Sequence, residues 1–256
     1  MKKAPAEPQG APRKPQSTRR VGWWVALAAL IVVGVALLSY NDVSTDVTPE
    51  DAVYAARMLR ETGHADLVGQ VRPADFDDQV ATILAVQGAV LSIAPDNQGI
   101  PFDRPRELRD LYQARSGLCF DRSRAIEKIL SSLGFEVRHA AVYSTKDASR
   151  LRAFLTPRTP SHALTEVKTA RGWLVIDSNR RWIGLTRDGT PVDLDALRET
   201  KAQQAWDSRL REPMSPILSG PFSYLFGLYS RHGRFYAPYT PIPDADWRQV
   251  LYNVTG

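Results

Sequence analysis

The chain has 256 residues, of which 43% are hydrophobic and 24% are charged, a balance typical of globular proteins. Its net charge of +5 arises in the first twenty residues, which hold six basic residues and one acid. The remainder is close to neutral and has no basic cluster, which excludes a nucleic-acid-binding protein. A single cysteine excludes a disulfide framework, and the zinc spacings C-x-x-C and H-E-x-x-H are absent.

One segment is long and apolar enough to cross a membrane. It runs from Val21 to Tyr40, reads VGWWVALAALIVVGVALLSY and contains no charge. A helix of this length spans roughly 30 Å, the thickness of a bilayer core. The basic residues before it predict a cytoplasmic N-terminus. No A-x-A pattern follows, so an uncleaved anchor is favoured over a signal peptide. We expect a single-pass protein of the bacterial inner (plasma) membrane with a periplasmic, extracytoplasmic domain.

Composition and patterning divide the chain into five predicted parts. In chain order these are a basic disordered leader (residues 1–20), a transmembrane anchor (21–40), a helical part (41–110), a core (111–190) and an extension rich in proline and aromatic residues (191–256). The extension is expected to pack on the core. Within it, the apolar run from Phe222 to Tyr229 is alternatively an exposed docking surface.

The helical part and the core show clear start and stop signals. Thr48 followed by Pro49 predicts a helix start. Apolar periodicity predicts further helices near residues 75–93 and 106–112. Small and apolar residues recur every three to four positions from Cys119, up to a C-cap glycine at Gly134. Cys119 is therefore expected in the first turn of a helix, after a turn that contains glycine.

Strand patterns follow this helix. Residues 135–143 alternate loosely and predict one strand, and residues 161–168 and 172–178 predict a hairpin that turns near residue 170. In such a hairpin, the residue numbers of each cross-strand pair add up to about 340. His162 and Asp177 are then almost opposite one another on one face, with Cβ atoms roughly 5 Å apart. A register slip of one residue would break this prediction.

These three residues fit nucleophilic catalysis by a thiol. A cysteine reacts as the thiolate, which the unpaired N–H groups and dipole of a helix start stabilise. A histidine accepts the thiol proton, and a carboxylate holds the imidazole in one tautomer and orientation. Cys119, His162 and Asp177 stand on elements that suit these roles. If each residue is considered alone, Cys119 is interpreted as a small buried hydrophobic residue and Asp177 as a turn residue. The order of Cys119, His162 and Asp177 along the chain favours catalysis instead.

The sequence resembles a known family over residues 116–182. The runs S-G-L-C, L-G-F-E-V-R, S-H-A-L-T-E-V and G-W-L-V-I-D-S are similar to those of the transglutaminase-like superfamily. The resemblance implies an α+β fold with a papain-like core, in which a helix bearing the cysteine packs on an antiparallel sheet. It also implies that Cys119 is the nucleophile, His162 the base and Asp177 the orienting acid. Arg138 matches an arginine with a structural role.

Two finer resemblances concern the residues after the cysteine. Cys119-Phe120-Asp121 is similar to a run in bacterial transglutaminase-like cysteine proteinases, where the acid binds calcium. One carboxylate is far short of the six to eight oxygen ligands of calcium, so no cofactor and no metal is expected, with calcium at Asp121 as the open alternative. The same run also resembles lasso-peptide-processing proteases, which a membrane anchor fits poorly. Leu164 replaces the family's aromatic residue after the histidine, which affects the expected substrate tunnel.

Three further histidines and one glutamine complete the candidates. His139 is a competing base without an evident acid partner, whereas His64 and His232 are expected to be structural. Gln113 lies six residues before Cys119 and is a weak candidate for the oxyanion partner, beside the Cys119 backbone N–H.

The residues leave two functions open. One is a cysteine-dependent amide hydrolase or acyl transferase, more specifically a thiol peptidase or amidase, with a peptide or protein substrate. The other is a non-catalytic accessory protein that uses the same fold to bind components of the cell envelope.

Overall fold

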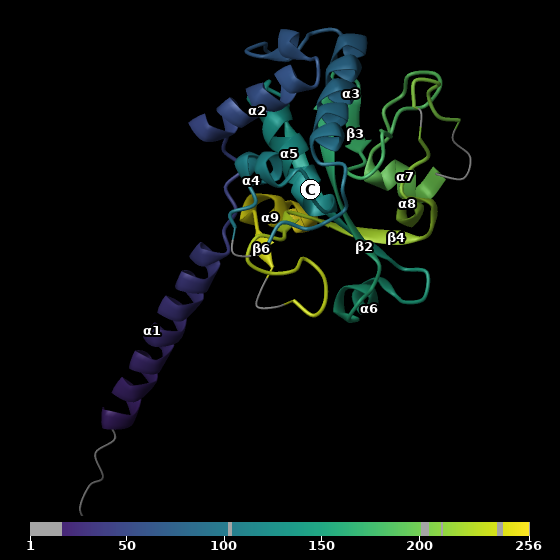
Figure 1. The fold of residues 1–256 in the computed structure, drawn as a ribbon. Coiled ribbons are helices and arrows are strands. Elements are labelled where there is room, and N and C mark those ends of the chain that lie inside the picture. The colour runs from purple at the N-terminus through teal and green to yellow at the C-terminus, as the bar shows by residue number, and fades with distance from the viewer. Residues whose placement is uncertain (1–16, 102–103, 201–204, 211, 240–242, 256) are drawn as a thin grey trace, which may run out of the picture. The chain divides into compact units, whose positions relative to one another are not determined.

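A computed structural model describes residues 17–101, 104–200, 205–210, 212–239 and 243–255 (Figure 1). The chain forms two compact units, Met1–Tyr40 and Asn41–Gly256. Helix α1 (Ser17–Tyr40) belongs to the first unit. Its segment Gly22–Tyr40 is long and apolar enough to cross a membrane, and none of it is buried within the chain. This segment coincides with the predicted anchor to within one residue.

The second unit begins with helices whose starts follow the predicted signals. In chain order they are α2 (Pro49–Glu61), the 3₁₀ helix η1 (Ala65–Leu67), α3 (Phe76–Ile93), α4 (Leu108–Ala114) and α5 (Cys119–Ser132). Thr48 caps α2: its hydroxyl accepts a hydrogen bond from the Asp51 N–H, and the Asp51 carboxylate accepts one from the Thr48 N–H. Gly134, with a φ of 85°, follows the end of α5. The predicted start of α5 at Cys119 is confirmed.

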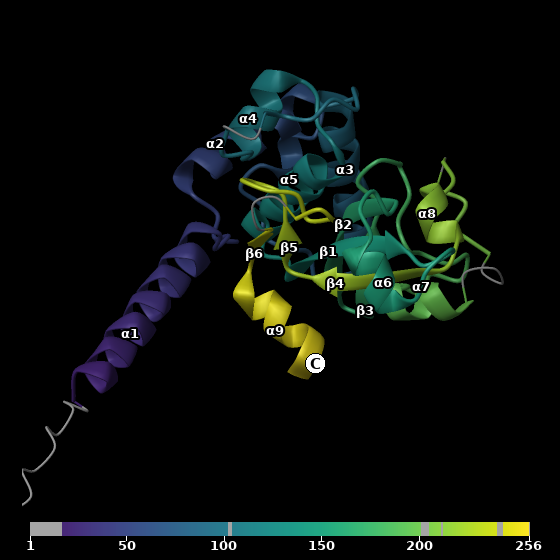
Figure 2. The same ribbon diagram turned by 90° about the horizontal axis from the view of Figure 1, so that it is seen from below.

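Four strands form an antiparallel sheet beside these helices. They are β1 (Val137–Ser144), β2 (Ser161–Thr169), β3 (Gly172–Ile176) and β4 (Phe222–Phe226). Their order across the sheet is β3-β2-β1-β4, and every neighbouring pair is antiparallel (Figure 2). Helices packed beside an antiparallel sheet make the domain a member of the predicted α+β class.

Helix α5 is packed between the sheet and the other helices. It contacts β1 and β2 on one side and α2, α3 and α4 on the other (Figure 1). Ile126, Ile129 and Leu130 are completely buried in the resulting core. Burial of each such side chain contributes about 1.5–3 kcal/mol, so the second half of α5 is firmly fixed. This packing sets the position of Cys119 at the other end of the helix.

The hairpin of β2 and β3 has a register one residue away from the predicted one. Thr165 is opposite Ile176, and Lys168 is opposite Trp173. Strand β3 ends at Ile176, so Asp177 lies beyond the ladder and diagonal to His162, not opposite to it. Because side chains alternate with a period of two, this diagonal still places both on the same face. The predicted register is therefore off by one residue, whereas the predicted placement of both side chains on one face is correct, and the two do meet.

The remaining elements surround the sheet. They are α6 (Arg150–Leu155), α7 (Leu194–Thr200), α8 (Pro216–Ser219), β5 (Leu228–Tyr229), β6 (Asp244–Ala245) and α9 (Trp247–Thr255). The run from Phe222 to Tyr229 supplies β4 and β5, and Phe222, Phe226 and Tyr229 are buried. The alternative prediction of an exposed docking surface there is wrong, because these aromatic side chains fill the core beside the sheet.

Candidate active site

Cys119 opens α5 and is partly exposed to solvent. The Asp121 carboxylate accepts a hydrogen bond from the Leu118 N–H at 2.9 Å, which stabilises this first turn. Gly117 lies just before it: a Cβ atom there would approach the Leu111 Cδ1 to 2.6 Å and the Asp121 Cβ to 3.1 Å. Only glycine fits this close approach without displacement of its neighbours. The glycine-containing turn predicted before Cys119 is thus explained by packing.

His162 lies near the start of β2 and is 3% exposed. Its Nε2 is 3.0 Å from the Asp177 Oδ1, and the ring also forms a hydrogen bond with Cys119. Because Nε2 faces the carboxylate, Nδ1 is the nitrogen left to face the sulfur. The three residues named from sequence are therefore brought together, with the imidazole between the thiol and the acid.

The environment of His162 favours its charged form. Burial alone lowers the pKa of His162, but the hydrogen bonds with Asp177 and Cys119 and their negative charges outweigh it and raise the pKa to about 10. An imidazolium held at neutral pH beside a sulfur atom stabilises a thiolate by charge and by hydrogen bonding. The arrangement suits a Cys–His ion pair.

Asp177 is completely buried and fully hydrogen-bonded. Its carboxylate accepts bonds from the Ser215 N–H at 2.7 Å, the Ser215 hydroxyl at 3.0 Å and the Asn179 N–H at 2.9 Å, in addition to His162. Burial raises the pKa of Asp177, but these hydrogen bonds outweigh that effect, and the pKa lies below its ordinary value. The carboxylate therefore stays ionised and can orient the imidazole.

Gln87 fixes the turn that carries Asp177. This side chain comes from α3 and is 1% exposed. Its Nε2 donates hydrogen bonds to three backbone carbonyls, those of Asp177, Arg180 and Trp182, at 2.7, 2.9 and 2.8 Å. In addition, the Asp177 N–H donates to the Trp182 carbonyl at 3.1 Å. The turn after β3 is thus closed on itself and attached to α3, which limits movement of the carboxylate.

Arg122 links three segments of the chain around the site. It is 3% exposed and lies one turn into α5. Its guanidinium donates to the Asn179 side chain at 2.8 Å, and to backbone carbonyls of Ala94, Pro95 and Asp96. The start of α5, the loop after α3 and the turn after Asp177 are therefore joined through one side chain. Its positive charge also interacts with Cys119.

The surroundings of Gln113 differ from those of the thiol. It is exposed on α4 and lines a surface hollow with Ile100, Pro101, Arg104, Asp110 and Ala114, a set that includes neither Cys119 nor His162. Its role as an oxyanion partner stays a prediction. The first turn of α5 offers another donor, because the first N–H groups of a helix have no intrahelical acceptor. The Cys119 N–H is one of these groups.

His139 occupies a separate buried cluster. It is completely buried on β1, where its Nδ1 lies 2.6 Å from the Glu127 Oε1 and 3.1 Å from the Ser123 hydroxyl. The expectation that His139 has no acid partner is therefore wrong. Ser123 and Glu127 lie one and two turns beyond Cys119 on α5, so this cluster attaches α5 to the sheet. His139 has no solvent access, which a base acting on an external substrate requires.

The other polar candidates form structural contacts. The His232 Nδ1 is 2.7 Å from the Asp244 Oδ1. The Asp121 Oδ1 is 3.1 Å from the Arg106 Nε, and both side chains are buried. A guanidinium thus takes a carboxylate oxygen that a calcium ion would need. Among the described residues, no three His, Cys, Asp or Glu side chains gather in a metal-binding group. These residues do not fit a calcium ion.

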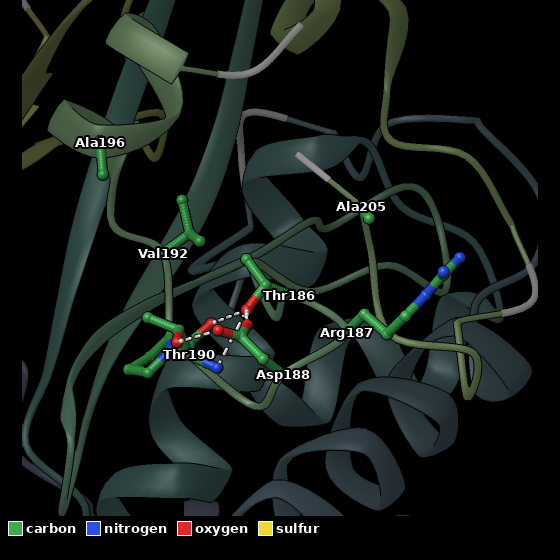
Figure 3. Close-up of a pocket in the computed structure, with 8 residues that line it drawn as sticks. Thr186, Arg187, Asp188, Thr190, Val192, Ala196 and Ala205 are labelled. Carbon is green, nitrogen blue, oxygen red and sulfur yellow. Dashed lines mark hydrogen bonds between the residues drawn. The ribbon is translucent and has the colours of Figure 1, made fainter. Parts of the chain in front are cut away.

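A further surface hollow lies away from the triad (Figure 3). Its lining residues are Thr186, Arg187, Asp188, Thr190, Pro191, Val192, Ala196 and Ala205. Within it, the Thr186 hydroxyl bonds with Asp188 and with the Thr190 carbonyl, and the Thr190 hydroxyl donates to Asp188 at 3.2 Å. These polar groups satisfy one another within a single turn. The residues that line this hollow do not include Cys119, His162 or Asp177.

Comparisons with known proteins give little information about this site. No family model matches the sequence, and no curated protein matches it. Among solved structures, the fold matches a candidate cysteine protease from Cytophaga hutchinsonii with 15% identity and a TM-score of 0.36. The match covers 53% of this chain and 39% of that chain, so this chain spans well under half of the other protein. A likeness this distant assigns neither a family nor an activity.

The structure adds four residues that the sequence did not single out for the site. Ser215, Asn179 and Arg122 carry no local signal, because each acts on a residue far away in the chain or through its backbone position. Gln87 did offer one: it is a polar residue that lies among Ile83, Val86 and Val90 on the buried face of α3. Such a residue needs buried hydrogen-bond partners, which here are the carbonyls of the turn after β3.

Proposed function

We propose that Cys119, His162 and Asp177 form the catalytic triad of a thiol peptidase or amidase. One observation carries the proposal: a buried imidazole hydrogen-bonds a helix-start cysteine on one side and a buried, ionised carboxylate on the other. Structural histidines need no such pair of partners, whereas covalent catalysis needs both. The partial exposure of Cys119 gives a substrate access to the sulfur.

The chemistry follows from the positions of these groups. The Cys119 thiolate attacks an amide carbonyl carbon, and a C–S bond forms as the carbonyl π electrons move to oxygen. The Cys119 N–H faces the developing oxyanion. His162 then gives its proton to the amide nitrogen as the C–N bond breaks, which leaves a thioester. Water attacks the thioester while His162 accepts a proton, and the C–S bond breaks to restore the thiolate.

The fold of this domain supports the same assignment. The cysteine begins a helix packed on an antiparallel sheet, the histidine lies on β2, and the acid directly follows β3. This is the order and placement that the transglutaminase-like resemblance implies. We propose that the domain has the papain-like core of that superfamily, with hydrolysis preferred over cross-linking.

We further propose that α1 anchors this domain to the bacterial inner membrane. The apolar segment Gly22–Tyr40 and the basic leader before it support a cytoplasmic N-terminus and a periplasmic domain. The substrate is then a peptide or protein of the envelope. An enzyme attached in this way acts on molecules near the membrane surface.

Covalent labelling combined with product analysis tests this function. A peptidyl acyloxymethyl ketone, which reacts with active thiolates, should label the full chain but not the Cys119→Ala variant. In envelope fractions, the wild-type chain should release new amino termini that the variant does not release. Absence of both results would reject the enzyme and favour an accessory protein that binds envelope components. Labelling without new termini would place the substrate outside the envelope fraction.

A further inference from the structure

The C-terminal helix α9 is amphipathic in the reverse of the usual sense. Two of its polar residues face the protein. The Gln249 side-chain oxygen accepts a hydrogen bond from the His139 N–H at 2.7 Å, and its side-chain NH₂ group donates one to the Tyr229 hydroxyl at 3.2 Å. Asn253 bonds both the N–H and the carbonyl of Phe226, at 2.8 and 3.0 Å. These contacts attach α9 along β4, which is an edge strand of the sheet.

Three of the apolar residues of α9 point away from the protein. Trp247, Leu251 and Val254 are 38, 62 and 86% exposed, and their spacing of four and three residues places them on one face. None of the helix residues is buried, and α9 lies at the edge of the second unit, below β4 and β6 (Figure 2). A helix held by polar contacts with its apolar stripe outward is arranged for a second apolar surface.

The start of the second unit lies directly beside this helix. The Asn41 carbonyl accepts from the Ala245 N–H at 2.8 Å, and the Val43 N–H donates to the Ala245 carbonyl at 3.0 Å. Helix α9 begins at Trp247, two residues after Ala245. Asn41 in turn follows Tyr40, the last residue of the apolar segment. The path from Asn41 to α9 within the second unit is therefore short, roughly 12 Å by standard residue and strand spacings.

We propose that the stripe Trp247, Leu251 and Val254 lies on the lipid surface from which the chain emerges. This inference rests on the proposed membrane anchor. A chain that leaves the bilayer at Tyr40 brings α9 to the headgroup region, where tryptophan is favoured and an apolar stripe inserts by about 5–10 Å.

The consequence is a second attachment point for the catalytic domain. Residues 41–43 and α9 are tied together through Ala245, and α9 is tied to β1 through His139 and to β4 through Phe226. A domain held by the anchor alone would rotate freely about its linker. With α9 on the lipid, the sheet and the helix that carries Cys119 take a fixed orientation toward the membrane surface.

Site-specific fluorescence in lipid vesicles tests this proposal on the full chain. In a Cys119→Ala background, an environment-sensitive dye is attached through Val254→Cys or, as a matched control, through Leu151→Cys on α6, which is 69% exposed. The proteins are reconstituted into vesicles of phosphatidylcholine and phosphatidylglycerol. Iodide reports contact with water, and brominated lipid chains report contact with the bilayer.

We expect the dye at position 254 to be protected several-fold from iodide and quenched by brominated lipid, and the dye at position 151 to show the opposite. Leu251→Gln should weaken lipid quenching at position 254, whereas Leu155→Gln should not. Protection from iodide without lipid quenching would mean that a protein surface, such as a second copy, covers α9, and would overturn the proposal. Full iodide access in protein that floats with the vesicles would overturn it while the anchor stands. Failure to float would instead reject the anchor itself.

Discussion

At the scale of single residues, the site depends on one imidazole between two partners. His162 is buried yet has a raised pKa, because Asp177 and Cys119 supply compensating hydrogen bonds and charge. Asp177 is buried yet has a lowered pKa, because four donors surround it. Each group therefore depends on the others for its charge state, and substitution of one alters the titration of the rest.

The titration of His162 is the first prediction at this scale. In the wild type the imidazole should stay protonated well above its ordinary pKa of 6.5, up to about 10. The stabilisation that the charged ring gives the fold is complete below about pH 6.5 and is lost as the pH rises through about 10. Asp177→Asn should lower the pKa of His162, because it removes the negative charge that offsets the effect of burial. An NMR titration of the imidazole measures both values, and an unchanged pKa in the variant would disprove the coupling.

Two histidines permit a direct comparison of roles. His162→Gln should abolish the enhanced reactivity of Cys119, since it removes the cation beside the sulfur. His139→Gln should leave that reactivity intact but lower the free energy of unfolding by about 1–3 kcal/mol, because Glu127 loses its buried partner. Thiol alkylation rates and urea unfolding measure the two effects. Loss of reactivity in the His139 variant alone would assign the base to His139.

At the scale of elements, the site lies where α5, the β2–β3 hairpin and α3 meet. Local patterns predicted the helix start at Cys119 and both strands, because capping, glycine and periodicity act over a few residues. The contacts that hold the acid could not be predicted in this way. Ser215 and Gln87 reach Asp177 across 38 and 90 residues, and no short pattern encodes such distances. The register error of one residue has the same origin, since the ladder is set by packing and turn geometry.

The hydrogen bonds between Gln87 of α3 and the turn after β3 give a prediction at this scale. Gln87→Met keeps the side-chain volume close but removes the donor to three carbonyls. We expect a loss of about 1–3 kcal/mol in unfolding free energy and a slower reaction of Cys119, because Asp177 gains freedom. The exposed Gln70→Met serves as the control and should change neither. If the Gln87 variant is measurably destabilised but Cys119 reacts at an unaltered rate, the hydrogen bonds of Gln87 do not contribute to the positioning of Asp177.

At the scale of the whole molecule, the chain joins a membrane-spanning candidate helix to a folded domain with one cysteine. Composition predicted the helix, because twenty uncharged residues satisfy a simple length rule. The α+β class was implied by the family resemblance over residues 116–182. The outward stripe of α9 did not, because a nine-residue amphipathic helix has the same pattern whether it faces a core or a membrane.

The single cysteine provides a native reporter of topology. Cys119 is partly exposed, so a membrane-impermeant maleimide should label it in intact spheroplasts without lysis. Labelling is expected on the proposed topology, in which the N-terminus is cytoplasmic and the domain lies outside. The Cys119→Ala variant controls for reaction elsewhere. If labelling required lysis, the domain would be cytoplasmic and the proposed localisation would be wrong.

The dependence of Cys119 alkylation on His162 tests the central claim most directly. Iodoacetamide modification of the full chain at neutral pH, followed by intact-mass measurement, gives the rate for the wild type and for His162→Gln. An imidazolium beside the sulfur stabilises the reactive thiolate, so the wild type should react about tenfold faster than the variant or more. Equal rates in the two folded proteins would contradict the triad.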